Sequence, residues 1–304
     1  MNKETDVIII GAGSAGMTAA IYLRRANLNV IMIEANAPGG QINRTARIEN
    51  YPGLGSIEGP SLAMNMFEQT QNLGIEYRYG NVSTVKKEGN KFIVNTDVEE
   101  LTSKAVIIAS GRRPNELGLE NEKNLTGRGI SWCAVCDGPF FKDKEVVVIG
   151  GGNSALEEAL YLTEFCKKVT IIHRRDEFRG DKENSKRVMN HPKIEVIFNS
   201  VVTNFNEANE RLESIDIENV NTRQKTKLKC DGVFIYIGFS PATRMVKDLG
   251  ITDDLDYIIT DQNQRTKIKG LYACGDVVKK ELYQIVTATS EGAIAAMSLV
   301  KDLY

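Results

Sequence analysis

The chain has 304 residues, a formal net charge of −2 at pH 7, and 42% hydrophobic against 26% charged residues, a composition typical of a globular protein with two ordinary domains. The near-neutral charge gives no reason to expect a nucleic-acid partner. No apolar run approaches the roughly 18 residues that a membrane-spanning helix needs, and residues 1–6 lack the layout of a signal peptide. We therefore expect a cytoplasmic protein without a membrane partner.

A glycine-rich turn follows the first expected strand. Residues 5–11 form a short apolar run typical of a strand buried on both faces, and residues 17–23 have helical composition. In the dinucleotide-binding fingerprint, Gly11 would allow the tight turn, Gly13 the approach of a pyrophosphate, and Gly16 close packing of helix on strand. The phosphates would lie at the helix N-terminus, where free N–H groups favour negative charge.

The second expected strand ends in an acid. Residues 29–33 are apolar except for Asn29, and Glu34 follows them. A carboxylate at this place accepts hydrogen bonds from a ribose with a free 2′-hydroxyl. A plain strand-to-helix turn would explain the glycines alone, but strand, helix and acid together favour a dinucleotide site.

The following segments are less informative. Residues 38–41 and 48–53 are rich in turn formers, and taken alone they predict surface connections. Residues 75–110 predict short strands joined by turns.

Two cysteines three positions apart, Cys133 and Cys136, stand beside Asp137 near the middle of the chain. The other three cysteines are scattered singly, which is a poor secreted disulfide framework and suits a reducing compartment with one special pair. Zinc is the competing use of such a pair, but a structural zinc site needs four ligands, and the two histidines, His173 and His191, are distant in sequence. We therefore favour a redox disulfide.

A second strand, glycine turn and helix begins after the cysteines. Residues 144–149 predict a second buried strand, with the apolar run at 146–149. Gly150, Gly152 and Ala155 fill the fingerprint positions, and residues 156–167 predict the helix.

The next strand, residues 169–172, ends in His173, Arg174 and Arg175, with Arg179 close behind. Arginines here offer charge-assisted hydrogen bonds to the 2′-phosphate of NADP, whereas an acid would repel it. A basic surface loop is the simpler alternative, but the position at the end of this strand favours NADPH over NADH.

The chain is a duplication of one unit. The segment 105–114 has an echo in 233–241: each is an apolar strand ending in glycine, with a proline three residues later. The segment 270–276 predicts a further strand and 284–302 a closing helix that packs on a sheet. Because 270–276 has no counterpart after the first copy, we expect the chain to return to the first unit, so that the second is an insertion into it.

Two dinucleotides and a thiol pair imply an electron chain. NADPH carries hydride, which thiols do not accept readily, and FAD is the suitable intermediary, with free ribose hydroxyls for Glu34. The resulting dithiol would reduce a partner disulfide by thiolate attack. Asp137 is the nearest acid to protonate a leaving thiolate, and a turn aspartate is its simpler interpretation.

The chain resembles the bacterial-type low-molecular-weight thioredoxin reductases nearly end to end. The motifs that carry the resemblance are GAGSAG (11–16), PGGQI (38–42), IENYPG (48–53), CAVCDG (133–138), GGGNSALEEA (150–159), HRRDEFR (173–179) and GD (275–276). The resemblance implies an α/β fold of two Rossmann-like dinucleotide-binding domains of the FAD/NAD(P)-linked reductase type, the second inserted into the first, and a homodimer. The FAD domain would comprise residues 1–115 and 243–304, and the NADPH domain, with the cysteines, residues 116–242.

Roles follow by resemblance. Glu34 would hold the adenosine ribose, the backbone near Val82 the adenine, and Asp276 the ribityl chain. The whole FAD set is Gly11, Ala12, Gly13, Ser14, Ala15, Gly16, Glu34, Ala35, Gly40, Gln41, Asn50, Val82, Ala109, Ser110, Gly111, Gly275, Asp276, Gln284 and Ile285. The NADPH set is Gly150, Gly151, Gly152, Asn153, Ser154, Ala155, Glu158, His173, Arg174, Arg175 and Arg179. No metal site is expected.

The resemblance also divides the thiol chemistry. Cys136 would be the flavin-proximal sulfur, Cys133 would attack thioredoxin, and Asp137 would donate the proton. The NADPH domain would rotate about linkers near 112–118 and 239–245, so that disulfide and nicotinamide reach the flavin in turn.

The chain departs from the family pattern at one position: Tyr283 stands where an arginine is usual, before Gln284 and Ile285. This change is expected to alter flavin packing or the approach of the nicotinamide. Three alternatives stay open: ferredoxin as the electron donor, a peroxiredoxin-type or glutaredoxin-like partner in place of thioredoxin, and a non-catalytic nucleotide-binding module.

Overall fold

The computed structural model describes residues 5–45 and 47–303. Residues 1–4, which enter the prediction about a signal peptide, lie outside this range. The chain divides into two compact units: unit 1 is Met1–Arg113 with Ser240–Tyr304, and unit 2 is Pro114–Phe239. Unit 2 is therefore inserted into unit 1. Within the described ranges, no helix is both long and apolar enough to cross a membrane.

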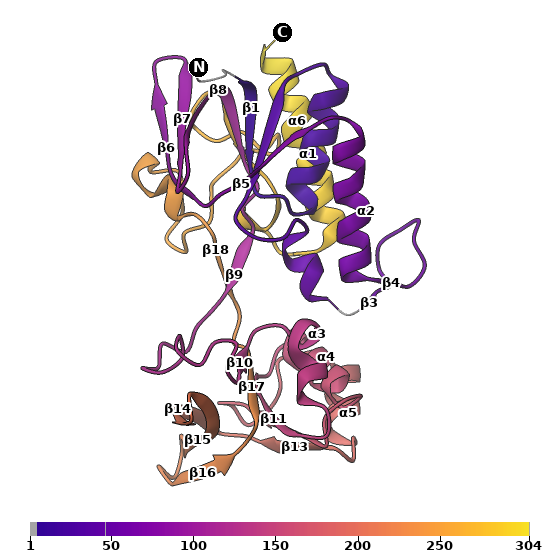
Figure 1. Ribbon diagram of the computed structural model, residues 1–304, viewed down its shortest axis with the longest axis vertical. Helices are drawn as coiled ribbons and strands as arrows, with labels where there is room; N and C mark the ends of the chain where they lie inside the picture. Colours follow the sequence, from indigo (N-terminus) through magenta and orange to yellow (C-terminus); the bar gives the residue numbers. More distant parts are fainter. Residues whose placement is uncertain (1–4, 46, 304) are drawn as a thin grey trace. The chain divides into compact units, whose positions relative to one another are not determined.

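Unit 1 is built on a seven-stranded sheet of order β5-β2-β1-β8-β7-β6, with β19 beside the end of β8. Figure 1 labels β5, β1, β8, β7 and β6 of this sheet. Strands β5, β2, β1, β8 and β19 run parallel, and β7 and β6 continue the sheet as an antiparallel hairpin. The bounds are β1 Thr5–Ile10, β2 Val30–Glu34, β5 Glu76–Tyr79, β6 Val82–Glu88, β7 Lys91–Thr96, β8 Glu100–Ile108 and β19 Leu271–Ala273. A two-stranded sheet pairs β3 Arg47–Ile48 with β4 Ile57–Glu58.

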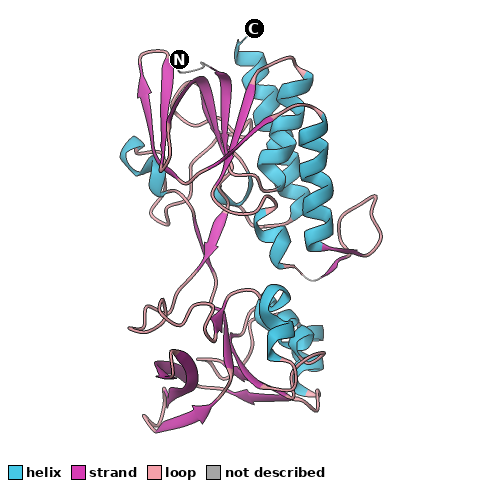
Figure 2. Cartoon of the chain, viewed as in Figure 1, coloured by secondary structure: helices cyan, strands magenta, loops and turns pink. Residues whose placement is uncertain are grey.

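Three helices cover one face of this sheet (Figure 2): α1 Ser14–Arg25, α2 Gly59–Asn72 and α6 Ile285–Leu303. Alternate residues of β1 explain the two faces. Val7 and Ile9 pack in the cluster that includes α1 and α6, while Ile8 and Ile10 pack against β6, β7 and the loops around residues 245–278. Strands buried on both faces read as continuous apolar runs. Short 3₁₀ helices complete the unit at Gly40–Arg44, Arg244–Leu249 and Gly275–Val277.

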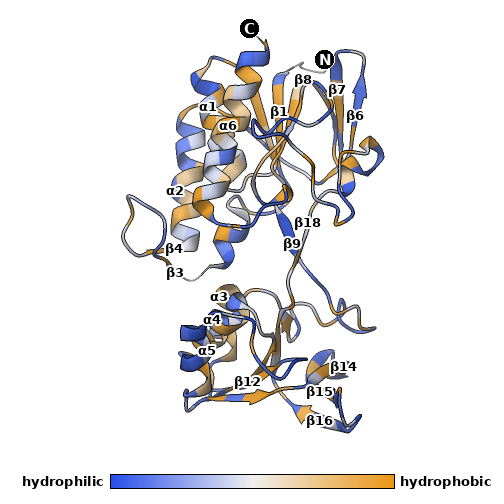
Figure 3. Ribbon diagram, turned by 180° about the vertical axis from the view of Figure 1, so that it is seen from behind, coloured by the Kyte–Doolittle hydropathy of each residue, from blue (hydrophilic) through white to orange (hydrophobic). Residues whose placement is uncertain are grey.

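Unit 2 has a parallel five-stranded sheet of order β10-β17-β11-β12-β13. Its strands are β10 Ile130–Ser131, β11 Glu145–Gly150, β12 Lys168–Ile172, β13 Ile194–Ile197 and β17 Gly232–Tyr236. Helices α3 Ala134–Asp137, α4 Asn153–Leu162 and α5 Lys182–Met189 accompany it, with a 3₁₀ helix at Gly138–Phe141. Val146 and Val148 pack toward α4, and Val147 and Ile149 toward a smaller sheet. In Figure 3, β12 of this sheet is largely orange, the hydrophobic end of the scale.

The smaller sheet is antiparallel and joins β14 Ser200–Ala208, β15 Arg211–Asn219 and β16 Lys225–Lys229. The chain passes between the units through β9 Arg112–Pro114 and β18 Phe239–Pro241, which pair with each other.

The α/β fold with two dinucleotide-type sheets, the second inserted into the first, is confirmed. Two expected elements differ in length. The strand predicted at 270–276 is limited to Leu271–Ala273, and the helix predicted at 156–167 begins at Asn153 and ends at Leu162. Residues 163–165 form turns in which the Thr163, Glu164 and Phe165 N–H groups donate to carbonyls three residues back. This is a common way for a helix to end.

Candidate active site

The first glycine turn has the geometry that a pyrophosphate site requires. Gly11 has φ +108°, and a Cβ there would collide with the carbonyl of Ala109; a Cβ on Gly16 would collide with the carbonyl of Gly11. By contrast, nothing lies within 4 Å of the place where a Cβ on Gly13 would be. The outer glycines thus serve close packing, and the middle one leaves open space at the start of α1. A dinucleotide fits this turn.

Glu34, the last residue of β2, holds the same turn. Its two carboxylate oxygens accept the N–H groups of Ala12 (2.9 Å) and Asn36 (3.0 Å). Ala35 follows it at the same edge of the sheet. Within the turn, Ala12, Ser14 and Ala15 are buried. The carboxylate is fixed at the carboxyl end of its strand, where a ribose would reach it.

Other predicted FAD residues lie at this carboxyl edge of the unit 1 sheet. Ala109, Ser110 and Gly111 follow β8, and the Ser110 hydroxyl donates to the Ala242 carbonyl (2.7 Å). Gly275 and Asp276 follow β19, which is parallel to β8. In a doubly wound sheet this edge is where ligands bind.

The loop after β2 brings further residues to this edge. A Cβ on Gly40 would lie 3.7 Å from the Cα of Gly13. The Gln41 side chain donates to the carbonyl of Arg112 (3.0 Å), and that of Asn50 donates to the side chain of Gln284 (3.0 Å). Ile285, next to Gln284, begins α6. Val82 begins β6, and its own side chain is in the core.

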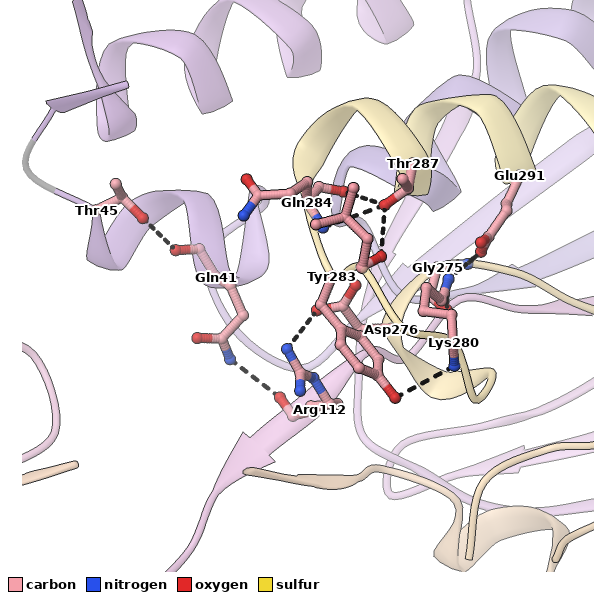
Figure 4. A network of polar contacts seen from close by, with 11 residues as sticks. Gln41, Thr45, Arg112, Gly275, Asp276, Lys280, Tyr283, Gln284, Thr287 and Glu291 are labelled. Atoms are coloured by element: carbon pink, nitrogen blue, oxygen red, sulfur yellow. Dashed lines mark hydrogen bonds and ion pairs between the residues drawn. The ribbon is translucent and has the colours of Figure 1, made fainter. Parts of the chain in front are cut away.

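Sequence reasoning missed a charged cluster here (Figure 4). The Arg112 guanidinium pairs with Asp276 (3.2 Å) and lies over the ring of Tyr283, 3.7 Å from its centroid. Glu291 of α6 accepts the N–H of Gly275 (2.8 Å) and pairs with Lys280. The pattern of residues within each segment could not reveal this cluster, because its members come from three separate segments of the chain.

The second glycine turn, in unit 2, repeats the first. Gly150 has φ +149°, and a Cβ there would collide with the carbonyl of Tyr236, whereas the corresponding position on Gly152 has nothing within 4 Å. Ala155, in the third position, is buried in α4. A side chain on Gly151 would collide with the ring of His173. This turn also fits a dinucleotide.

The basic loop after β12 folds back onto that turn. The backbone N–H groups of Arg179 and Gly180 donate to the Gly151 carbonyl (2.7 and 3.1 Å), while the side chains of Arg174, Arg175 and Arg179 are exposed. His173 is buried, and its Nε2 has no hydrogen-bond partner among the described residues. Burial, followed by the charge of Arg179, lowers the pKa of His173.

Helix α4 supplies the remaining predicted NADPH residues. Asn153 and Ser154 open it, and the Asn153 side chain accepts the N–H of Asp181 (2.7 Å). One turn on, burial and then the charge of Glu157 raise the pKa of Glu158 to about 8. A largely protonated carboxyl beside a glycine turn could donate as well as accept hydrogen bonds.

Cys133 and Cys136 form a disulfide, with Cα atoms 5.3 Å apart. Cys133 is the residue before α3, and its sulfur accepts the N–H of Cys136 (3.1 Å). Cys133 is buried and Cys136 is exposed. The other three cysteines are reduced and buried; burial raises the pKa of Cys166 to about 11 and those of Cys230 and Cys274 to about 12.

Two residues that the sequence analysis did not select support the disulfide. Ser131 donates its hydroxyl to the Asp137 carboxylate (2.6 Å) and accepts the N–H of Cys133 (2.9 Å). The Tyr236 hydroxyl accepts the N–H of Ala134 (2.9 Å). The cysteines, Asp137 and the second glycine turn all belong to unit 2, while the predicted FAD residues all belong to unit 1.

The comparisons with known proteins agree with this geometry. The pyridine nucleotide-disulphide oxidoreductase family matches residues 5–292. A thioredoxin reductase of Bacillus subtilis is 47% identical over 98% of this chain and 94% of its own, and one of Listeria monocytogenes is 45% identical over the same shares. The crystal structure of Lactococcus lactis thioredoxin reductase, 44% identical, superposes with a TM-score of 0.93 over 98% of this chain and 99% of its own. The chain therefore belongs to the pyridine nucleotide-disulphide oxidoreductases, flavoproteins of the type that uses FAD and NADPH.

Proposed function

We propose that this chain reduces the disulfide of thioredoxin with electrons from NADPH, through FAD and the Cys133–Cys136 pair. The observation that carries the proposal is the disulfide in the same unit as a glycine turn flanked by arginines. The name of the relatives that span almost the whole chain supports thioredoxin as the partner.

We assign FAD to residues 1–115 with 243–304, and NADPH to residues 116–242. When bound, FAD takes hydride from NADPH and returns two electrons to a disulfide. The open space at Gly13 and Gly152 would take the two pyrophosphates, Glu34 would accept from the FAD ribose, and the exposed arginines would pair with the 2′-phosphate.

The thiol chemistry balances as an exchange. Two electrons and two protons open the Cys133–Cys136 disulfide to two thiols. The Cys133 thiolate attacks the disulfide of thioredoxin, forming a mixed disulfide and releasing one thioredoxin thiolate. Cys136 then attacks the Cys133 sulfur, which restores the disulfide of this chain and releases thioredoxin as a dithiol. Asp137 would protonate the leaving thiolates.

Two observations point in opposite directions on which cysteine attacks thioredoxin. The N–H of Cys136 donates to the Cys133 sulfur, which favours Cys133 as the thiolate and thus as the attacking group. Cys136, however, is the exposed one of the pair. We keep Cys133 as the attacking sulfur. The test mixes Cys133→Ser and Cys136→Ser proteins separately with activated thioredoxin. We expect a mixed disulfide through Cys133, formed by the Cys136→Ser protein. A mixed disulfide through Cys136 alone, formed by the Cys133→Ser protein, would reverse the roles.

The function itself is tested by NADPH oxidation with a panel of disulfide proteins. We expect a yellow protein whose flavin absorbance bleaches with NADPH, and turnover with thioredoxin faster than with peroxiredoxin-type or glutaredoxin-like proteins. A flavin that bleaches only with reduced ferredoxin would favour the ferredoxin-dependent alternative. A colourless protein that binds no FAD would favour a non-catalytic nucleotide-binding module.

We further propose a homodimer. Val286, Ile294 and Met297, on one face of α6, are 38–49% exposed, and Met64 of α2 is also exposed. An exposed apolar face of this kind is typical of an association surface. Light scattering after gel filtration should give twice the monomer mass, and Ile294→Glu with Met297→Glu should give a monomer, whereas Met189→Glu in unit 2 should not. A monomeric native chain would refute the proposal.

A further inference from the structure

Arg112 is held on two sides (Figure 4). Its guanidinium lies over Tyr283, with Cζ 3.7 Å from the ring centroid, and one of its nitrogens is 3.2 Å from Asp276 Oδ2. The Arg112 and Asp276 side chains are each only 19% exposed. A long side chain fixed by both a stacking contact and an ion pair has lost most of its rotamer freedom. The position of the Arg112 charge is therefore fixed.

The place where this charge is held matters. Arg112 follows the Gly111 turn at the carboxyl end of β8, Asp276 follows β19, and Tyr283 precedes α6. Ligands of doubly wound sheets bind at this edge. The Gln41 side chain reaches the same place, where it donates a hydrogen bond to the main-chain carbonyl of Arg112.

The neighbouring cation is already committed elsewhere. Lys280 pairs with Glu291 and donates to the carbonyl of Gly275 (2.7 Å), so it fixes the turn that carries Asp276. Burial raises the pKa of Tyr283 to about 12, and the face of its neutral ring attracts a cation. Arg112 is thus the cation that faces Asp276.

We propose that Arg112 is a positioning residue for FAD: it orients the Asp276 carboxylate toward the ribityl chain and holds a positive charge at the flavin end of the site, with Tyr283 as its platform. This inference rests on the proposed function. A fixed positive charge beside the flavin favours its reduction, because reduction adds negative charge. Arg112 should therefore both tighten FAD binding and raise the reduction potential of the bound flavin.

The geometry also explains how the tyrosine at position 283 is tolerated. Because the Tyr283 ring touches the Arg112 guanidinium, an arginine at 283 would place a second cation beside Arg112. The two positions can each supply one cation to one place, but both together would repel.

The experiment compares Arg112→Gln with Arg113→Gln, the same change at the next residue, whose side chain is exposed. FAD affinity is measured by titrating apoprotein and following flavin fluorescence, and the potential of bound flavin by equilibration with a redox dye. We expect Arg112→Gln to weaken FAD about tenfold and to lower the potential, with Arg113→Gln and Tyr283→Phe close to the native chain. The double variant Arg112→Gln/Tyr283→Arg should recover most of both losses.

Four results would overturn the proposal. One is equal FAD affinity and potential in Arg112→Gln and Arg113→Gln; another is a folded double variant no better than Arg112→Gln. Native apoprotein that does not bind FAD would refute the proposed function together with this inference, whereas the first two results leave that function intact. If circular dichroism shows Arg112→Gln to be unfolded, Arg112→Lys carries the test: it keeps the charge, so its potential should stay near native, and a low potential contradicts the proposal.

Discussion

Ser131 connects the acid and the disulfide in unit 2. Its hydroxyl hydrogen goes to Asp137, and its oxygen receives the N–H of Cys133. The side chain is buried, so water does not readily replace it. Asp137 is thereby held in one orientation beside the cysteines before any partner arrives.

Removing this hydroxyl should impair the thiol half of the reaction. Loss of one hydrogen bond to a charged group costs about 1.5–3 kcal/mol, so Ser131→Ala should slow disulfide reduction roughly 10- to 100-fold. Ser131→Thr, which keeps the hydroxyl, should lose much less. Stopped-flow measurement of flavin reduction by NADPH should show no change in either variant. If Asp137→Asn proves as active as the native chain, Ser131 has no acid to position and the prediction is wrong.

Glu158 makes stability depend on pH. Its folded pKa of about 8 lies above the value of 4.5 for an unperturbed carboxyl. Between these values the folded chain holds a proton that the unfolded chain has lost, so the free energy of unfolding falls as pH rises.

The matching prediction concerns Glu158→Gln, which cannot ionise. Its gain in Tm over the native chain should be near zero at pH 5 and about 2–4 °C at pH 8. Differential scanning calorimetry at pH 5, 6.5 and 8 measures it, with Glu183→Gln, in the first turn of α5, as the control. A difference in Tm between the native and Glu158→Gln chains that stays the same across this pH range would contradict the argument.

At the scale of elements, the loop between β12 and α5 combines a fixed backbone with exposed basic side chains. Its backbone is tied to the second glycine turn at Gly151, yet its arginine side chains stay exposed. Tied backbone and available charge together are what recognition of a phosphate requires.

Alanine at both Arg174 and Arg175 should therefore weaken the binding of NADPH much more than the binding of NADH. Each arginine that contacts the 2′-phosphate is worth about 1.5–3 kcal/mol, so NADPH should bind at least tenfold more weakly, while NADH, without that phosphate, changes little. Arg223→Ala is the matched control, because Arg223 is an exposed arginine of the same unit that pairs with Glu218. Titration by nicotinamide fluorescence gives both constants. Equal weakening of NADPH and NADH would mean that these arginines do not read the phosphate.

The same scale shows what sequence can and cannot predict. Strands such as β1 and β11 were predictable because burial on both faces leaves a continuous apolar run, and each glycine turn has a spacing set by backbone geometry. The sheet of β14, β15 and β16 was not predicted. β16 in particular, Lys225–Lys229, has mainly exposed charged and polar residues and is held by backbone pairing with β15.

The contacts of Arg112 and Ser131 escaped for another reason. The partners of Arg112 are 164 residues away at Asp276 and further on at Tyr283, so only the folded chain brings them together. Ser131 is close to its partners in sequence, but nothing in the residue types distinguishes it from a serine in a turn. The cysteines and glycines, in contrast, have spacings that few other functions use.

At the scale of the whole molecule, each unit has its own core. The hydrophobic clusters around β1 and β8 draw only on residues before 114 or after 239, and the two clusters around β11 draw only on residues between them. A core that is complete within one segment is the condition for independent folding.

Residues 114–239 alone should therefore fold cooperatively and bind NADPH. Urea unfolding followed by circular dichroism should give a single sigmoidal transition, and nicotinamide fluorescence should show preference for NADPH over NADH without any flavin colour. Gly150→Val in the same fragment is the control, since its side chain would collide with the Tyr236 carbonyl. A fragment with no cooperative transition, or one that folds but binds no NADPH although the full chain does, would show that unit 2 needs unit 1 for its nucleotide site.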